Sequence, residues 1–364
     1  MTLPSSGPLT FTEIETEFGS NGNRGLGRYR ADSIHFTNKT VGDLGRITEG
    51  GYLPLDDGIP KSGTIKFSDF RGKSQNVIVD CHSAGGDHIN AKTDRWDSND
   101  VLVVGGYKNP SQKKESGSKI IIHINKTFKS VHSTTANTCA LRTGEWNSIA
   151  GMRVDLGDNA KLYGAGGNGG LGADHGQNNG GAGKPGNSGL GIEMNNTIVN
   201  VNSGALIQCG YGGGGGGGSA RQEDPGQDRS AGGGGGGGGA GFPAGEGAKG
   251  GETGNTSGNA TFSHGSDGQD GSKPNTNAAR EGGAGGEGGD NAEEAKGGDG
   301  GRGGDTEAGP QDGGDDRGNN KGETEGGAAG GNGAAIRRDS GISVTINNSG
   351  SNNIIGSTTA TGVA

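Results

Sequence analysis

Two unbroken runs of glycine, Gly212–Gly218 and Gly232–Gly239, restrict the possible folds of this chain more than any other feature. They belong to a chain of 364 residues that contains 87 glycines and in which only 26% of residues are hydrophobic. Because apolar side chains are scarce, one conventional hydrophobic core cannot order the whole chain. Large apolar residues gather in residues 1–211 and 336–355, so the glycine-rich part is either held together in another way or disordered.

The glycine tracts have a period of three residues. Segments 282–290 (GGAGGEGGD) and 297–305 (GGDGGRGGD) have glycine at two of every three positions. Three residues per turn is the repeat of a polyproline II-type helix, which has no internal hydrogen bonds. Two glycines per turn let neighbouring helices approach and exchange backbone hydrogen bonds, and stacking many helices offsets the entropy of ordering glycine. We therefore expect a polyglycine II bundle whose third residues face solvent, among them Glu287, Asp290, Asp299, Arg302 and Asp305.

Short β-type runs precede the tracts. VIVDC (77–81), VLVV (101–104) and KIIIHI (119–124) predict a β-rich domain of sandwich or prism type. Segments 154–170 and 199–218 each contain a strand, a turn, a second strand and then a glycine tract, and 343–357 repeats this order without the tract. A disordered linker has no reason to begin at strand ends.

Two other interpretations of the tracts are a disordered segment and a calcium β-roll. The β-roll requires an aliphatic residue in each repeat, which the tracts lack. A lone SDGQDGS at 266–272 is a weak candidate for binding an ion. If the insert between the two long runs is one reversing loop, the runs are adjacent antiparallel helices.

A repeated motif lies near the start of the chain. PSSGPLTFTEI (4–14) and PKSGTIKFSDF (60–70) share a Ser-Gly turn, a short strand and a helical turn, with the Thr12 or Ser68 hydroxyl placed to cap it. The pair resembles segments of the type PxSGxIxFSDIxxxxG at the start of tail and tail-fibre proteins of tailed bacteriophages. This resemblance implies that residues 1–74 dock onto another tail protein, with 72–75 as a polar linker.

These observations predict a mainly β chain with a polyglycine II helical bundle. The expected division is a small mixed N-terminal virion-attachment module with an internal repeat (1–76), a sandwich-like or prism-like β-rich domain (77–163), a glycine-rich polyglycine II domain with an interleaved β segment at 192–209 (164–335), and a C-terminal β segment (336–364).

Several classes of function are disfavoured. A formal charge of -9 without a basic stripe argues against nucleic-acid binding. No signal peptide or membrane-spanning run is evident, so we expect neither export nor membrane insertion. The scattered cysteines predict buried thiols in a chain that folds in a reducing cytoplasm. The histidines have no metal-binding spacing and no catalytic motif is present, so we expect no metal, no cofactor and no enzyme.

The chain has glycine tracts that begin at strand ends and are separated by non-glycine inserts, with β-rich sequence before them and a short β-type segment after them. This arrangement resembles the distal tail-fibre adhesins of T-even-type bacteriophages. That family implies a rigid polyglycine II sandwich whose variable tip loops bind the host receptor. Carried onto this chain, it predicts a virion tail protein, folded in the host cytoplasm, that binds an outer-membrane protein or a polysaccharide. The candidate loops are 219–230, 253–264, 272–281 and 305–325. The candidate receptor-binding residues are Tyr211, Arg221, Arg229, Phe242, Phe262 and His264.

Three alternatives remain open from the sequence. The first is a purely structural tail or virion decoration protein in which the bundle is a rigid spacer. An ice-binding protein is the second, although charged third positions disfavour a flat ice-binding face. The third is a capsule-degrading enzyme, which no pair of carboxylates at a defined spacing supports.

Overall fold

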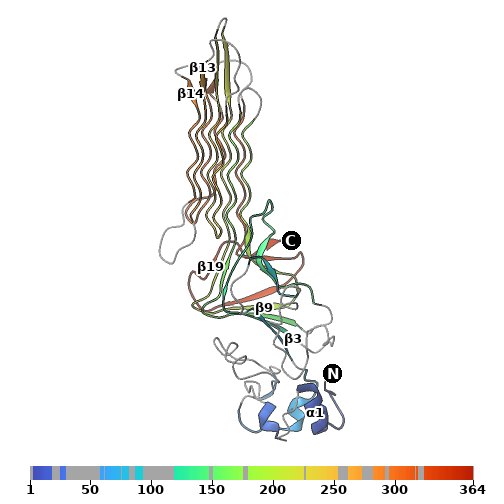
Figure 1. The fold of residues 1–364 in the computed structure, drawn as a ribbon. Helices are drawn as coiled ribbons and strands as arrows, with labels where there is room; N and C mark the ends of the chain where they lie inside the picture. Colours follow the sequence, from blue (N-terminus) through green and yellow to red (C-terminus); the bar gives the residue numbers. More distant parts are fainter. Residues whose placement is uncertain are drawn as a thin grey trace.

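A computed structural model describes residues 3–18, 25–29, 58–60, 62–74, 76–81, 87–92, 119–146, 151–174, 179–224, 227–252, 261–272, 282–291, 295–315, 317–318 and 324–363. The strand predicted at 101–104 and most of the predicted loops at 253–264 and 272–281 lie outside these residues. Figure 1 shows a small helical module at one end, β-sheets in the middle, and a bundle of glycine-rich segments that extends from the sheets to the far end.

The N-terminal module contains α1 (Phe11–Phe18) and the 3-10 helices η1 (Leu26–Tyr29) and η2 (Phe67–Phe70). The two motif copies begin alike, because Gly7 and Gly63 both have positive φ, but an α-helix follows in the first copy and a shorter 3-10 helix in the second. The helix cap is not the predicted Thr12. Instead the Glu13 amide donates to Thr10 Oγ1 (3.2 Å) and the Thr10 amide donates to Glu13 Oε2 (2.7 Å). The helix begins at Phe11, so the capping residue lies one position before it.

This module packs directly against the sheets. Its core, which contains Leu3, Ile14, Phe18, Tyr29, Ile59 and Phe70, also includes Ile121 of strand β3. The predicted polar linker is wrong for the described part of 72–75, because Ser74 is fully buried and its hydroxyl contacts Glu17 Oε1 at 3.3 Å. The Leu3 amide also donates to the Lys73 carbonyl (2.9 Å). The module is therefore fixed to the sheets through packing.

Three sheets of parallel strands form the middle of the molecule, and we name them A, B and C. Sheet A contains β1 (Val77–Cys81), β3 (Lys119–Ile124), β6 (Gly151–Leu156), β9 (Thr197–Val201) and β18 (Val344–Asn348). Sheet B contains β4 (Thr127–Lys129), β7 (Lys161–Tyr163), β10 (Leu206–Gln208) and β19 (Ile354–Ile355). Sheet C contains β2 (Ile89–Asn90), β5 (Cys139–Arg142), β8 (Ser188–Ile192), β17 (Ile336–Arg338) and β20 (Ala360–Thr361).

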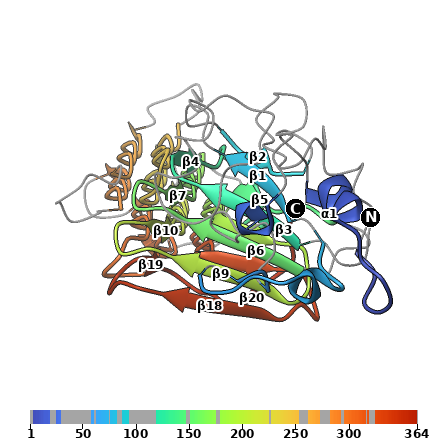
Figure 2. The ribbon, with the colours of Figure 1, turned by 90° about the horizontal axis from the view of Figure 1, so that it is seen from below.

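The chain visits the sheets in rotation. It runs β3, β4, β5, then β6, β7, β8, then β9, β10, β17, and finally β18, β19, β20, and each strand pairs in parallel with the strand of the next coil. This is a three-sided prism, and Figure 2 shows its strands stacked coil on coil. Strands at 188–208 and 336–361 thus complete the same sheets as the strands of 77–163.

The prism core consists of stacked equivalent side chains. On sheet A, Ile122, Val154 and Val199 are register partners and all are fully buried. Alternation along the strand explains this stack. The β6 side chains Met152, Val154 and Leu156 are buried, and the side chains between them are partly exposed. A short apolar strand in each coil is therefore sufficient to build a continuous core.

The glycine tracts are insertions at one corner of this prism. Residues 164–187 separate β7 from β8, and residues 209–335 separate β10 from β17, so both insertions leave sheet B and return to sheet C. The last coil makes the same corner with only residues 356–359. The predicted order of strand, turn, strand and tract is therefore the order of one prism coil.

Small sheets lie at the far end of the bundle (Figure 1). One contains β11 (Ala220–Asp224), β12 (Gln227–Ala231) and β13 (Thr261–Ser263). The other contains β14 (Asp290–Asn291), β15 (Ala295–Lys296) and β16 (Arg317–Gly318). We call these two sheets the tip, and the opposite end of the bundle, next to the prism, the base.

Candidate functional site

The bundle consists of extended segments that alternate in direction between base and tip. Their described parts are 164–174, 179–187, 209–219, 231–240, 243–252, 263–272, 282–290, 296–305, 310–315 and 324–334. Their hydrogen bonds recur every third residue: the amides of Gly167, Gly170 and Ala173 donate to the carbonyls of Tyr211, Gly214 and Gly217. Figure 2 shows the segments end-on as separate narrow coils beside the sheets.

The unbroken run Gly232–Gly239 occupies the interior of this bundle. Three consecutive residues show its surroundings. The amides of residues 232, 233 and 234 donate to the backbone carbonyls of Ser263, Ala173 and Gly298, respectively. The three carbonyls accept from Gly289, Gly251 and Gly217. Each of these bonds reaches a different segment. The run Gly212–Gly218 is surrounded in the same way, so both runs have backbone neighbours in every direction.

Interior position explains why these runs contain only glycine. A Cβ placed on Gly236 would overlap the carbonyl oxygen of Gly214, and one placed on Gly214 would overlap that of Gly301. Outer segments have one face free, and the predicted third-position residues Glu287 and Asp299 are exposed there. Arg302 is partly exposed. The side chain of Asp290 lies outside the described part of the molecule.

Asp305 departs from the predicted solvent-facing position because it is buried at the base. Burial alone would raise its carboxyl pKa, but amide hydrogen bonds from Ala308, Glu307 and Gly282 and the ion pair with Arg302 hold the pKa below its usual value. The chain reverses direction immediately after this residue. Asp305 therefore caps the reversal instead of facing solvent.

On the surface of the bundle, Asp and Asn side chains accept hydrogen bonds from backbone amides. The Gly250 amide donates to Asp267 Oδ1 (2.9 Å), and three residues away the Gly247 amide donates to Asp270 Oδ1 (2.9 Å). The same contact recurs between other outer segments, for example from the Ala329 amide to Asp312 Oδ1 (2.7 Å). An outward-facing amide thereby acquires an acceptor where no neighbouring backbone is available.

The tip is built on the insert that joins the two glycine runs. The insert is a hairpin, because β11 and β12 pair antiparallel from Ala220 opposite Ala231 to Asp224 opposite Gln227. The Gly217 amide donates to the Gly234 carbonyl and the Gly214 amide to the Gly237 carbonyl, so the runs are antiparallel, which confirms the prediction. The two tip sheets meet through the buried residues Ala220, Ala231 and Ala295.

Four of the predicted binding residues lie at or beside the tip. Arg221 and Arg229 lie on the two hairpin strands, and Phe262 lies on β13, where its backbone pairs with Ser230. Arg221 is half-buried. His264 follows β13 directly and its side chain is exposed. These residues come from segments far apart in the sequence, and the fold brings them to one end of the molecule.

The other two predicted residues, Tyr211 and Phe242, lie at the base. Tyr211 is only 7% exposed and packs with Cys209 and Ala240. The Phe242 ring contacts the ring of Tyr163 on β7, edge to face, with centroids 5.7 Å apart. Lys129 Nζ lies 5.4 Å from the centre of the Phe242 ring. These aromatics join the bundle to the prism.

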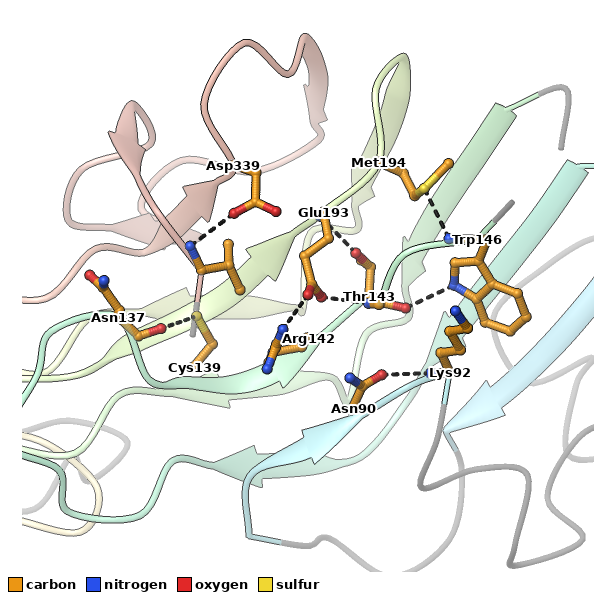
Figure 3. A network of polar contacts seen from close by, with 12 residues as sticks. Asn90, Lys92, Asn137, Cys139, Arg142, Thr143, Trp146, Glu193, Met194 and Asp339 are labelled. Atoms are coloured by element: carbon orange, nitrogen blue, oxygen red, sulfur yellow. Dashed lines mark hydrogen bonds and ion pairs between the residues drawn. The ribbon is translucent and has the colours of Figure 1, made fainter. Parts of the chain in front are cut away.

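Sequence reasoning missed a buried polar network in the prism (Figure 3). Glu193, just after β8, pairs with Arg142 and accepts a hydrogen bond from the Gly144 amide (2.6 Å). Gly144 has positive φ, and a Cβ there would collide with the side chain of Lys92. The ion pair raises the pKa of the Arg142 guanidinium. No sequence signal links Glu193 to Arg142, because they meet only through the parallel pairing of β5 with β8.

The three cysteines are buried free thiols, as predicted. Burial raises the pKa of Cys139, beside this network, to about 12. Among the described residues no cluster of three His, Cys, Asp or Glu side chains could hold a metal ion. The described helices include none of the length and apolarity needed to cross a membrane.

Comparisons with known proteins complete this description. The family model described as phage tail fibre adhesin Gp38 matches residues 88–360. Among solved structures, the chain is similar to the gp37-gp38 adhesin tip complex of the bacteriophage S16 long tail fiber, at 17% identity and a TM-score of 0.37, over 97% of this chain and 99% of that chain. A search of curated proteins found no match.

Proposed function

Because this chain belongs to the phage tail fibre adhesin Gp38 family, we propose that it attaches to the virion at one end and recognises the bacterial surface at the other. A tail fibre adhesin is a virion tail protein, and its family is one of adhesins and not of enzymes. The observation that carries the proposal is the arrangement of the molecule: the N-terminal module and the tip lie at opposite ends (Figure 1). The chain folds in the host cytoplasm before it joins the virion.

The bundle acts as a rigid polyglycine II rod between these ends. The three-residue recurrence of its hydrogen bonds supports this assignment, because three residues per turn is the repeat of that helix. Interior segments are bonded to neighbours on all sides, so bending the rod would break several bonds at once. A rigid rod holds the tip at a fixed distance from the prism.

The receptor-binding surface lies at the tip. The hairpin that contains Arg221 and Arg229, strand β13 with Phe262, and the exposed His264 contribute to it. Binding residues concentrate on connections held by a rigid scaffold, and the tip connections fit this description. Tyr211 and Phe242 are not part of the proposed surface, because they lie in the junction at the base.

Virion attachment uses the duplicated motif of the N-terminal module and a second tail fibre protein. The equivalent residues Phe11 and Phe67 contact each other, with ring centroids 6.3 Å apart, and the Phe67 side chain remains 41% exposed. Aromatic side chains of this kind are common anchors in protein interfaces. Phe67→Asp should lower incorporation of the protein into virions about tenfold or more. Leu171→Asp, at another exposed apolar residue on the rod, should leave incorporation unchanged.

A segment exchange tests receptor recognition. Residues 219–231 at the tip are replaced by the corresponding segment of a family member from a phage with another host, and adsorption to both hosts is measured. The exchange should shift adsorption toward the second host. Exchange of residues 240–244 at the base is the control and should preserve host choice. If host choice is unaffected by the tip exchange, the protein is a structural spacer and the proposal is wrong.

A further inference from the structure

A polar groove runs along the side of the rod just below the tip. It lies between the rising segment 243–252 and the descending segment 263–272 and has a volume of about 350 Å³. Its floor is glycine backbone, and its walls are Lys249 and Glu252 on one side and His264 and Asp267 on the other. Pockets that hold small ligands begin at about this volume.

The wall residues are positioned by the rod and not by a mobile loop. The Gly250 amide donates to Asp267 Oδ1 (2.9 Å) and so holds this carboxylate beside the groove that it lines. The Gly265 amide donates to the Gly251 carbonyl (3.2 Å) and ties the two walls together. The Glu252 amide donates to Asp174 Oδ1 (2.8 Å), so its backbone is also fixed. All four wall side chains are exposed.

The side chains that line the groove suit some classes of ligand better than others. It has no apolar side chain among its lining residues, so it does not suit an apolar ligand. The groove is lined by two carboxylates and one ammonium, and this excess of negative charge disfavours a phosphate or another anion. No metal-binding cluster occurs among the described residues, here or elsewhere. Carboxylate acceptors and an ammonium donor around a glycine backbone are complementary to hydroxyl groups, which both donate and accept hydrogen bonds.

From this complementarity we infer that the groove binds an uncharged saccharide unit of the bacterial surface. The inference rests on the proposed function and specifies the receptor chemistry at one side of the tip. The carboxylates of Glu252 and Asp267 accept hydrogen bonds from adjacent hydroxyls, and Lys249 donates to a hydroxyl or ring oxygen. Such a contact is weak for a single sugar, with a Kd on the order of 1 mM, and it gains strength when several adhesins engage together.

The test is an NMR titration of the purified full chain. The probes are delipidated lipopolysaccharide oligosaccharide and capsular oligosaccharide from a strain that the virion infects, and they distinguish the two sources of sugar. One double variant, Glu252→Gln with Asp267→Asn, removes both negative charges. The asparagine at position 267 still offers an Oδ1 acceptor to the Gly250 amide. Asp270→Asn is the matched control, because Asp270 makes the same type of bond to Gly247 and does not line the groove.

The expected result is saturable binding of one oligosaccharide, weakened about tenfold in the double variant and unchanged in Asp270→Asn. If neither probe binds, the inference is wrong, and it is also wrong if Asp270→Asn weakens binding as much as the double variant does. Adsorption of the same proteins to whole cells separates this failure from failure of the proposed function. Cell binding without saccharide binding leaves the adhesin function standing and excludes the groove, whereas loss of both contradicts the function itself.

Discussion

The Gly217 amide donates a hydrogen bond to the Gly234 carbonyl oxygen, 2.8 Å away, and so joins the two unbroken glycine runs side by side. One turn further, Gly214 and Gly237 make the same contact at the same distance. These contacts require two backbones to meet without any Cβ between them. Segments with the composition of a flexible linker therefore form the interior of the rod, and their lack of side chains is a requirement of packing.

The interior position of Gly236 predicts that Gly236→Ala is strongly destabilising. The new Cβ would overlap the Gly214 carbonyl oxygen, which belongs to backbone and cannot rotate away. Overpacking of this kind costs about 1–3 kcal/mol or more in the free energy of unfolding. Thermal unfolding measures it. Gly331→Ala is the control, because a Cβ there meets no atom within 4 Å, and it should leave the melting temperature nearly unchanged. Equal melting temperatures for the two variants would contradict the interior assignment.

Asp312 provides a test of the hydrogen bonds between side chains and amides on the outside of the rod. The Ala329 amide donates to its Oδ1 at 2.7 Å. Asp312→Ala leaves this amide without its protein acceptor and should cost about 1 kcal/mol of unfolding free energy. Asp312→Asn retains an Oδ1 acceptor and should cost much less. Denaturant unfolding of both variants checks the difference, and an equal cost for both would show that the charge and not the acceptor matters.

The burial of the Cys139 thiol predicts that the protein becomes less stable at alkaline pH. A solvent-exposed cysteine thiol has a pKa of about 8.5, and burial raises the pKa of Cys139 to about 12 in the folded protein. Above about pH 9 the unfolded chain loses this proton while the folded chain keeps it, so the unfolding free energy falls as pH rises toward the folded pKa. Denaturant unfolding between about pH 9 and pH 11 should show a shallower decline for Cys139→Ala than for the unsubstituted protein. Parallel declines would mean that this thiol does not ionise on unfolding.

The bundle could be anticipated from the sequence because its cause is local. Glycine at two of three positions leaves backbone as the only surface on which segments can pack, and the strand before each tract predicts where it begins. The antiparallel direction of the two glycine runs could be predicted because a single short insert that reverses the chain joins them. The buried thiols were also predictable, from their isolation in the sequence.

The remaining features depend on long-range pairing. Nothing around Phe242 indicates whether its turn lies at the tip or the base, since that depends on how many segments precede it. Asp305 resembles other third-position residues and is buried only because the chain reverses after it. The prism required the pairing of β8 with β17, which are separated by the whole glycine insertion.

Hydrogen exchange at the amides of Gly232–Gly239 tests the central claim most directly. Each of these amides donates to a backbone carbonyl of another segment. In a folded rod, exchange of a peptide covering this run, followed by mass spectrometry, should be slowed by orders of magnitude relative to an unstructured chain. The exposed segment 5–8 at the start of the N-terminal module provides an internal reference that should exchange quickly. Exchange of the glycine run at the rate of an unstructured peptide would contradict the account, because the tip would then have no rigid support.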